Sequence, residues 1–307
     1  MVVDRPRIRL VQLPERLALT CPDTCMDAIS QFSRPHTTYL SAPANKFLCP
    51  ASHPGRLAES APVQEYLTRS GGWLRYDTGE RTPEGRRVMK IGIIGAGNIG
   101  GNLTRRLTAL GHDVSVANSR GPHTLTALAE ETGATAVPVE EAARGAQVVV
   151  VTIPLKAVPN LPSGFLDGAA DGLAVIDTGN YYPQQRDGKI AEIEDGLTES
   201  RWTEQQIGHP VIKAFNGTYS GDILDKPQPK GTPGRVALPV SGDDEAAKKV
   251  VRDLIDEIGF DTVDNGGQDD SWRQQPGTPV YGLAKDTEAV TKALSEASPE
   301  RTAEWRA

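Results

Sequence analysis

Short apolar runs alternate with amphipathic stretches along the chain after residue 88, and this alternation predicts strands that are followed by helices. The runs that we predict as strands lie at 91–94, 112–120, 135–137, 147–152, 174–177, 210–213, 236–239 and 260–263. The continuous apolar character of several of them is typical of strands that are buried on both faces. Strands that alternate with helices in this way indicate a parallel sheet that is covered by helices.

The helical segments are recognised by apolar positions that recur at three- and four-residue steps. We predict helices at 98–110, 124–132 and 202–207, and a helical turn at 139–144. A further helix is predicted between Asp243 or Asp244 and residue 258, and a last one from about residue 287. Asp243 or Asp244 is expected to cap the helix that Gly259 closes. The polar stretches 184–201 and 224–235 contain proline or glycine, and we predict that they are loops.

A glycine-rich turn joins the first predicted strand to the first predicted helix. Residues 89–101 read Met-Lys-Ile-Gly-Ile-Ile-Gly-Ala-Gly-Asn-Ile-Gly-Gly. In a nucleotide-binding turn the first glycine permits the sharp bend, the second lets the backbone approach a pyrophosphate, and the third lets helix and strand pack closely. The helix N-terminus then offers unpaired N–H groups to the phosphates. The predicted cofactor contacts in this turn are Gly95, Ala96, Gly97, Asn98, Ile99 and Gly100.

The end of the second predicted strand indicates which dinucleotide binds. An NAD site usually carries Asp or Glu there, about 20 residues past the glycines, to bind the ribose 2′-hydroxyl. This chain has Asn118, Ser119 and Arg120 instead. A guanidinium and a hydroxyl suit the 2′-phosphate of NADP, which would repel a carboxylate. The sequence therefore predicts NADP, and the alternative is an ordinary solvated arginine after a strand.

Composition narrows the class of protein. The chain has 307 residues and a formal net charge of −7, which argues against a general nucleic-acid binder. No apolar run approaches the roughly 20 residues of a membrane span, so we expect no membrane partner and a cytoplasmic location. Residues 1–88 differ from the rest, because they hold twelve Lys and Arg against nine Asp and Glu, together with all three cysteines.

The leader of residues 1–88 has three interpretations. In the first, Met89 is the natural start of the protein, and in the second the leader is a disordered extension. The third is a small zinc module with a Cys3His set drawn from Cys21, Cys25, Cys49 and His53. The spacing of these four residues is loose, so we favour the first two interpretations and predict no metal site.

Polar residues gather where the predicted strands end. In an open parallel sheet a ligand binds outside the carboxyl ends of the strands, so these residues should border one crevice. Thr152, Ile153 and Pro154 follow the fourth strand and are expected to border the nicotinamide half of the cofactor. The residues expected on the substrate side, and the candidates for catalysis, are Asn180, Lys213 and Asn216. In the alternative interpretation Lys213 is only a solvated strand end.

No competing catalytic signature is present in the sequence after Met89. That part has no Gly-x-Ser-x-Gly, His-Glu-x-x-His or Cys-x-x-Cys pattern, and its histidines are scattered. No residue in it stands out as an acid–base catalyst. This matters because hydride transfer to a carbonyl needs a proton donor, whereas transfer to a flavin-like ring can proceed without one.

Several of these motifs occur together in one known family. They are the turn Gly95-x-Gly97-x-x-Gly100, the pair Ser119-Arg120, the run Val151-Thr152-Ile153-Pro154, and Ser241-Gly242-Asp243-Asp244 followed by Lys248-Lys249-Val250-Val251. In these features the chain resembles the NADPH-dependent coenzyme F420 reductase family, the F420-dependent NADP oxidoreductases, from Met89 to about Asp270. The run from Val211 to Asn216 is also similar to the cytosolic reductase domain of membrane ferric reductases. The resemblance implies NADPH on the glycine turn and the Ser-Arg pair, and direct hydride transfer from the nicotinamide to a deazaflavin.

We therefore expect an α/β protein with a Rossmann-type doubly wound, mostly parallel sheet at 89–240 and a small C-terminal α/β extension at 241–307. The expected function is NADPH-dependent hydride transfer to a flavin-like or deazaflavin acceptor such as coenzyme F420. The alternatives are a carbonyl or imine reductase and a protein that senses NADP without turnover. Such reductases typically add a long helical domain, whereas fewer than 50 residues follow the last predicted strand here. The expected partner is a small redox substrate, and a homodimer is expected by analogy alone.

Overall fold

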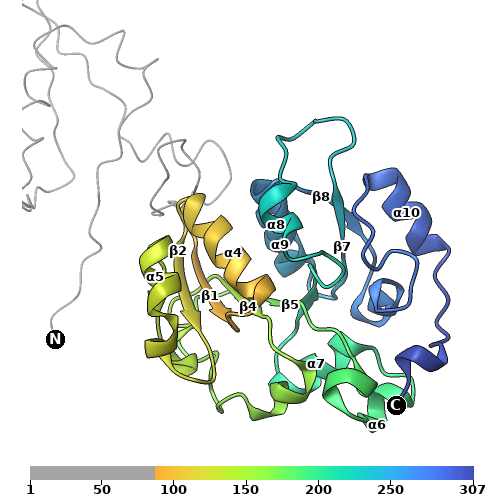
Figure 1. Cartoon of the computed structure of the whole chain (residues 1–307), viewed down its shortest axis with the longest axis horizontal. Helices are drawn as coiled ribbons and strands as arrows, with labels where there is room; N and C mark the ends of the chain where they lie inside the picture. The colour runs from red at the N-terminus through yellow and green to blue at the C-terminus, as the bar shows by residue number, and fades with distance from the viewer. Residues whose placement is uncertain (1–86) are drawn as a thin grey trace, which may run out of the picture. The chain divides into compact units, whose positions relative to one another are not determined.

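A computed structural model describes residues 87–307 of the chain (Figure 1). The four zinc-ligand candidates and the rest of residues 1–86 of the predicted leader lie outside the described residues. Between residues 87 and 307, no helix is both long enough and apolar enough to cross a membrane.

Six parallel strands form the main sheet, in the order β3-β2-β1-β4-β5-β6. The strands are β1 (Lys90–Ile94), β2 (Asp113–Ala117), β3 (Thr135–Ala136), β4 (Val148–Val151), β5 (Ala174–Asp177) and β6 (Ile212–Lys213). The chain builds outward from β1 to β3 and then returns to the other side of β1 for β4. This order confirms the predicted Rossmann-type sheet and creates a switch point between β1 and β4.

The strands are buried on both faces, as their apolar runs predict. Side chains alternate along β4, so Val148 and Val150 belong to one apolar cluster, and Val149 and Val151 belong to a second cluster on the opposite face. All four valines are at most 1% exposed. The register places β4 between β1 and β5, so both clusters continue across the sheet.

Helices cover the sheet unevenly. They are α4 (Asn98–Ala109), α5 (Thr126–Thr132), α6 (Ala191–Glu194), α7 (Glu199–Ile207), α8 (Asp222–Asp225), α9 (Glu245–Ile258) and α10 (Thr287–Ser295). Apolar side chains of α4 and α9 share one core cluster with β1, β2, β4 and β5. The second cluster is completed by short segments near Ala142 and Phe165 rather than by a long helix.

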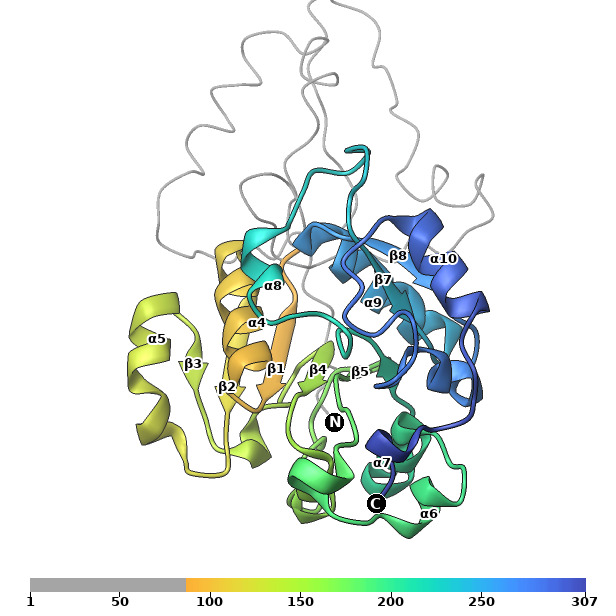
Figure 2. The same cartoon turned by 45° about the vertical axis from the view of Figure 1, so that its right-hand side comes forward.

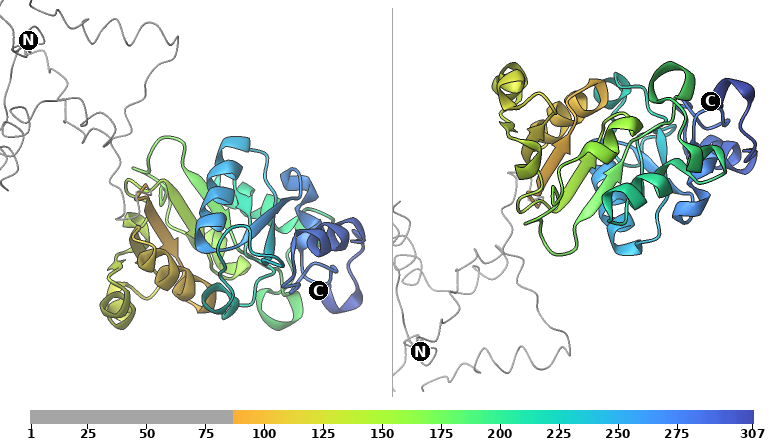
Figure 3. Two further views of the ribbon diagram at one scale, coloured as in Figure 1. Left: turned by 90° about the horizontal axis from the view of Figure 1, so that it is seen from above. Right: turned by 90° about the horizontal axis from the view of Figure 1, so that it is seen from below.

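A second, smaller sheet lies beyond β6. Its parallel strands, β7 (Ala237–Val240) and β8 (Asp261–Asp264), are connected by α9. An antiparallel bridge between Lys213 and Ser241 links it to β6. Figure 3 shows these light-blue elements beside the main sheet, on the side away from the orange and yellow elements around β1, with the dark-blue C-terminal residues at the far end. The predicted domain boundary after residue 240 falls between β7 and α9, and therefore inside the β7-α9-β8 unit.

The stretch 184–201 is not a loop, so that prediction was wrong. It holds most of a short π-helix, Pro183–Asp187, then α6 and the first turn of α7. These elements are too short to give a helical pattern in the sequence. The start of α7 is fixed by Thr198, whose Oγ1 accepts a hydrogen bond from Arg201 N at 3.2 Å.

The N-terminus of α9 is capped by Asp244 rather than by Asp243. The Oδ1 atom of Asp244 accepts hydrogen bonds from Ala246 N at 2.9 Å and from Ala247 N at 3.0 Å. Asp243 instead accepts a hydrogen bond from Gln268 N at 2.8 Å, so it ties the helix start to a later segment. The sequence could not distinguish between these two adjacent carboxylates, because only the direction of the backbone decides which of them faces the helix.

We expect Asp244→Ala to lower the free energy of unfolding by about 0.5–2 kcal/mol, because two N–H groups lose their acceptor. Urea unfolding of the purified chain measures the change. Asp253→Ala is the matched control on the same helix, since it removes only an exposed ion pair with Lys249 and should cost less than about 0.5 kcal/mol. Equal losses in the two variants would contradict the capping role.

Candidate functional site

The strands β1 and β2 point toward the end of the domain at which α6, α7 and the C-terminal residues lie (Figure 2). The glycine turn lies at this edge, between β1 and α4, and it faces the ends of β2 and β4. Its position is fixed by hydrogen bonds from Gly95 N to Ala117 O at 2.8 Å and from Thr152 N to Ile94 O at 2.9 Å. The predicted cofactor residues of the first, second and fourth strand ends therefore share one edge of the sheet.

Two glycines of the turn have no room for a side chain. A Cβ at Gly95 would lie 2.2 Å from Thr152 O, and Gly95 has a φ of +110°. A Cβ at Gly100 would lie 1.9 Å from Gly95 O and 2.7 Å from Thr152 Cγ2. The turn, the first turn of α4 and the end of β4 are thus in direct contact, which is the close packing that the motif predicts.

The second glycine of the motif, Gly97, leaves open space. A Cβ at Gly97 would meet nothing within 4 Å, and Gly97 and Asn98 are exposed. No side chain caps the N-terminus of α4, and its first turn carries no acidic residue. The N–H groups at this end of a twelve-residue helix are therefore available to an anion, as a pyrophosphate would require.

The end of β2 carries a free guanidinium. Ser119 and Arg120 are exposed, and the Arg120 side chain makes no hydrogen bond or ion pair with any residue between 87 and 307. Asn118 shapes this turn, since its Oδ1 accepts from Arg120 N at 2.9 Å and its Nδ2 donates to Thr124 Oγ1 at 2.9 Å. Asn118 is therefore engaged in holding the turn, while Ser119 and Arg120 are free for a ligand.

Thr152, Ile153 and Pro154 lie directly against the glycine turn. The Ile153 side chain comes within 2.9 Å of the position that a Cβ on Gly95 would take. Pro154 then starts the 3₁₀ segment Leu155–Asn160, so the chain leaves the sheet at this point. All three residues are half-buried, so none of them is fully enclosed by the protein.

Asn180 and Asn216, which are far apart in the sequence, lie side by side. Asn216 Nδ2 donates to Asn180 Oδ1 at 3.0 Å, and Asn180 Nδ2 donates to Asn216 O at 2.8 Å. Gln274, which the sequence did not single out, completes this group by donating to Asn216 Oδ1 at 3.0 Å. The sequence offers little to identify Gln274 beforehand, because it is one amide in a segment without helical or strand periodicity.

The backbone is strained immediately before Asn216. Phe215 has a φ of +62° and is the one residue other than glycine with a positive φ between residues 87 and 307. Its side chain is 2% exposed. Such a conformation costs about 1–3 kcal/mol and persists only where the surroundings enforce it. The strain turns the chain at the end of β6 and directs Asn216 toward Asn180.

Lys213 is fully buried, so the interpretation as a solvated strand end was wrong. Its Nζ donates to Gly179 O at 3.0 Å and to Ser200 Oγ at 3.1 Å, and lies 3.5 Å from Glu199 Oε2. Asp177 Oδ1 accepts from Gly179 N at 2.8 Å. Both backbone groups of Gly179, the residue before Asn180, are thus held by buried side chains from β5 and β6.

Glu199 is the carboxylate of this buried network. It lies between Lys213 and Arg301, whose Nη2 donates to Glu199 Oε1 at 2.9 Å. Burial raises the pKa of Glu199 above its ordinary value, and the charges of Lys213 and Arg301 oppose that shift. Because Lys213 is enclosed and its partners are all internal, it positions the loop with Asn180 rather than contacting a ligand.

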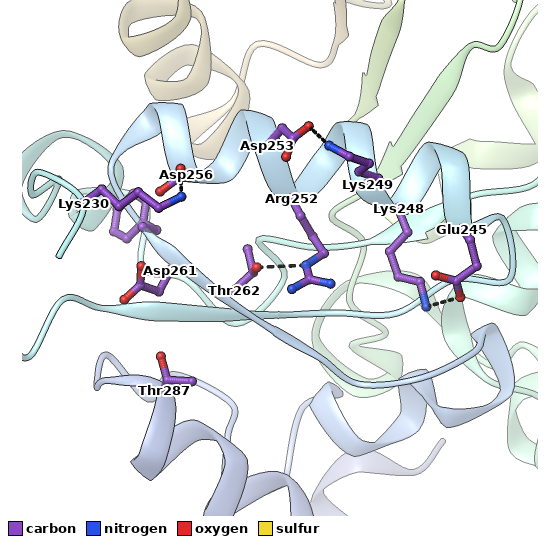
Figure 4. A pocket seen from close by; sticks show the side chains of 11 residues that line it. Lys230, Glu245, Lys248, Lys249, Arg252, Asp253, Asp256, Asp261, Thr262 and Thr287 are labelled. Carbon is purple, nitrogen blue, oxygen red and sulfur yellow. Dashed lines mark hydrogen bonds and ion pairs between the residues drawn. The ribbon is translucent and has the colours of Figure 1, made fainter. Parts of the chain in front are cut away.

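A hollow of about 370 Å³ lies beside α9 and β8 (Figure 4). None of its lining residues belongs to the glycine turn or to the strand ends described above. Its basic side chains are engaged with neighbours: Lys230 with Asp256, Lys248 with Glu245, Lys249 with Asp253, and Arg252 with Thr262. The hollow therefore offers a cofactor phosphate no free positive charge. Among residues 87–307, no group of three or more His, Cys, Asp or Glu could hold a metal ion.

The fold and the glycine turn define a Rossmann-type domain with the turn of a dinucleotide site. Residues 90–181, from β1 to the loop after β5, match the family described as NADP oxidoreductase, coenzyme F420-dependent. Over these residues the match confirms the resemblance that the sequence motifs indicate.

Curated relatives match parts of the chain. The protein YjhV of Escherichia coli (strain K12) is 48% identical over 63 residues, which are 20% of this chain and 44% of that protein. Erythronate-4-phosphate dehydrogenase of Salinibacter ruber (strain DSM 13855 / M31) is 39% identical over 144 residues, which are 42% of this chain and 33% of that protein. The chain thus spans less than half the length of these two relatives.

A solved structure covers more of the chain. The protein SMa0349 of Sinorhizobium meliloti is 29% identical, with a TM-score of 0.54. The similarity covers 64% of this chain and 94% of that chain.

We expect Arg120→Ala to weaken NADPH binding by about 1–3 kcal/mol, because a charge-assisted contact with the 2′-phosphate is lost. NADH lacks this phosphate, so its affinity should change little. Equilibrium titration of both cofactors against the wild-type chain and the variant measures the difference. An equal loss for NADPH and NADH would contradict the role given to Arg120.

We expect Lys213→Met to lower the free energy of unfolding by about 3–5 kcal/mol, because it removes one partner of a buried ion pair. Lys226→Met is the matched control, since Lys226 forms a more exposed pair with Asp222 within one helix and should change stability by less than about 0.5 kcal/mol. Chemical unfolding measures both. A Lys213→Met chain that is as stable as the wild type and yet inactive would instead indicate a direct catalytic role.

Proposed function

We propose that this domain transfers a hydride between NADP(H) and a flavin-like or deazaflavin acceptor of the coenzyme F420 kind. The observation that carries the proposal is the pair of amides, Asn180 and Asn216, on the substrate side of the sheet edge. Asn216 is buried and its amide bonds only to Asn180 and Gln274, so it fixes Asn180, the half-buried amide that would meet the acceptor.

The cofactor half of the proposal rests on two separate anion sites. The uncapped N-terminus of α4 would hold the pyrophosphate, and the free guanidinium of Arg120 would hold the 2′-phosphate. Ser119 would add a hydroxyl to the second site. Thr152, Ile153 and Pro154, which pack on the glycine turn, would support the nicotinamide half.

The acceptor half rests on the chemistry of the amides. An amide can donate to the carbonyl oxygens and accept from the N–H groups of a flavin-like ring, but it does not exchange protons near neutral pH. Hydride transfer between two rings needs alignment above all, because a near-attack geometry replaces a chance encounter. Asn180, held in place by the buried Asn216, would supply such alignment.

A carbonyl or imine reductase would need a proton donor at the same place. Lys213 is enclosed below Gly179, and the hydroxyls of Tyr182 and Tyr281 bond to each other. Burial and the bond to Tyr182 raise the pKa of Tyr281 well above its ordinary value, which makes it a weaker acid. The amide pair therefore favours the ring acceptor over the carbonyl acceptor.

Stopped-flow mixing of the full chain and NADPH with coenzyme F420, FMN or a small carbonyl compound tests the proposal. We expect NADPH to be oxidised by a ring acceptor and a primary isotope effect when the transferred hydrogen is deuterium. Asn180→Ala should slow this step about 10–100-fold, because the acceptor is held less well. Asn160→Ala, an exposed asparagine outside the site, is the control.

Two outcomes would overturn the proposal. Oxidation of NADPH by the small carbonyl and by no ring acceptor would make the protein a carbonyl reductase. Tight NADP binding without oxidation by any of these acceptors would favour a protein that senses NADP without turnover.

A further inference from the structure

The C-terminal segment Arg301–Ala307 is fixed at its start. Arg301 Nη2 donates to Glu199 Oε1 at 2.9 Å and to Gln275 Oε1 at 3.0 Å. The guanidinium also lies 5.2 Å from the centre of the Tyr181 ring. These contacts connect the segment to the buried network below Asn180, so its first residue cannot move far without breaking charged hydrogen bonds.

Trp305 is the second contact of the segment. Its ring lies 5.9 Å from that of Tyr182 in a tilted arrangement and 6.3 Å from that of Tyr281 in the edge-to-face arrangement that aromatic pairs favour. The indole also lies over the backbone of Gly277, where a Cβ would come within 2.6 Å of Trp305 Cδ1. Trp305 thus packs against two tyrosine rings and the backbone of a glycine.

Tyr182 belongs to the loop that carries Asn180, and Tyr281 lies in a later segment that is bonded to the loop of Asn216. Tyr182 follows Asn180 by two residues, and Gly282, next to Tyr281, donates to Gly217 O at 3.1 Å, beside Asn216. The hydroxyls of Tyr182 and Tyr281 bond to each other. Trp305 therefore packs on the outer side of the two tyrosine rings, which join the segment of Tyr182 to that of Tyr281.

The rest of the segment is weakly held. Residues 302–304, 306 and 307 are exposed, and Gln184 Nε2 donates to two of their carbonyl groups, Ala303 O at 3.0 Å and Arg306 O at 2.9 Å. Surface hydrogen bonds of this kind open at low cost, whereas the anchor at Arg301 is partly buried. Trp305 is held more firmly than these residues, because it packs on two rings and Arg301 Nη1 donates to its carbonyl oxygen at 3.3 Å.

We propose that Trp305 is a specificity-determining residue that forms the outer aromatic wall of the acceptor site and selects acceptors with a planar ring. This inference rests on the proposed function, because the wall adjoins the amide pair assigned to the acceptor. A planar conjugated ring can stack on Trp305, Tyr182 or Tyr281, and a small acyclic carbonyl compound gains nothing from such a wall.

Steady-state kinetics of the full chain with NADPH and FMN provide the first test. Trp305→Ala is expected to raise the KM for FMN about fivefold to tenfold, because one ring–ring contact is lost. The Kd for NADPH should stay within about twofold, and Trp305→Phe, which keeps a ring, should resemble the wild type. An unchanged KM for FMN in Trp305→Ala, with the fold intact by circular dichroism, would overturn the proposal.

A second pair of variants changes how the C-terminal segment is held and leaves Trp305 itself in place. Gln184→Ala releases two carbonyl groups of the segment, and the adjacent Gln185→Ala is its control, because Gln185 is exposed and makes no side-chain hydrogen bond to residues 87–307. We expect Gln184→Ala to raise the KM for FMN and Gln185→Ala to leave it unchanged. The same effect in both variants would contradict the role of the segment.

Fluorescence separates this inference from the proposed function, because it needs no turnover. The signal of Trp305 is the difference between the wild-type chain and Trp305→Phe. We expect oxidised FMN to quench it in the NADP⁺-bound protein and NADP⁺ alone to leave it unchanged. Quenching without hydride transfer would sink the proposed function and support the wall, whereas FMN reduction without quenching would sink the wall and support the function.

Discussion

Direct backbone contact between the glycine turn and the end of β4 is the constraint on which the rest of the structure depends. Gly95 and Gly100 face Thr152 with no space for a Cβ, so the first turn of α4 begins against the sheet edge. This contact directs the uncapped helix end into the switch point between β1 and β4. Any side chain at these two positions would push α4 away from the edge of the sheet at which a dinucleotide is expected.

The two halves of the site are built on different physical principles. The proposed cofactor half uses free backbone N–H groups and one exposed guanidinium. The proposed substrate half rests on buried charges, because Lys213 and Glu199 are enclosed, pair with each other and with the partly buried Arg301, and hold the loop that carries Asn180. Buried pairs of this kind add little net stability, but they fix a single arrangement of the chain when every partner is present.

The sequence predicted most of the strands and helices, because their apolar periods are local properties of consecutive residues. It also predicted the glycine turn, whose spacing is itself the physical requirement. It did not predict the burial of Lys213 or the part played by Gln274, because their partners are distant: Glu199 and Asn216 reach them only after the sheet has formed. The short helices within 184–201 were missed because a single helical turn shows no period.

The helix α9 has a consequence for how the molecule loses its structure. It connects β7 to β8, yet its apolar face packs into the same core as β1, β4 and β5. The small sheet meets the large one through one bridge at Lys213, so by strand pairing alone it would be an independent unit. With α9 shared between them, neither sheet can expose its core alone, and heat or denaturant should melt both in one cooperative transition.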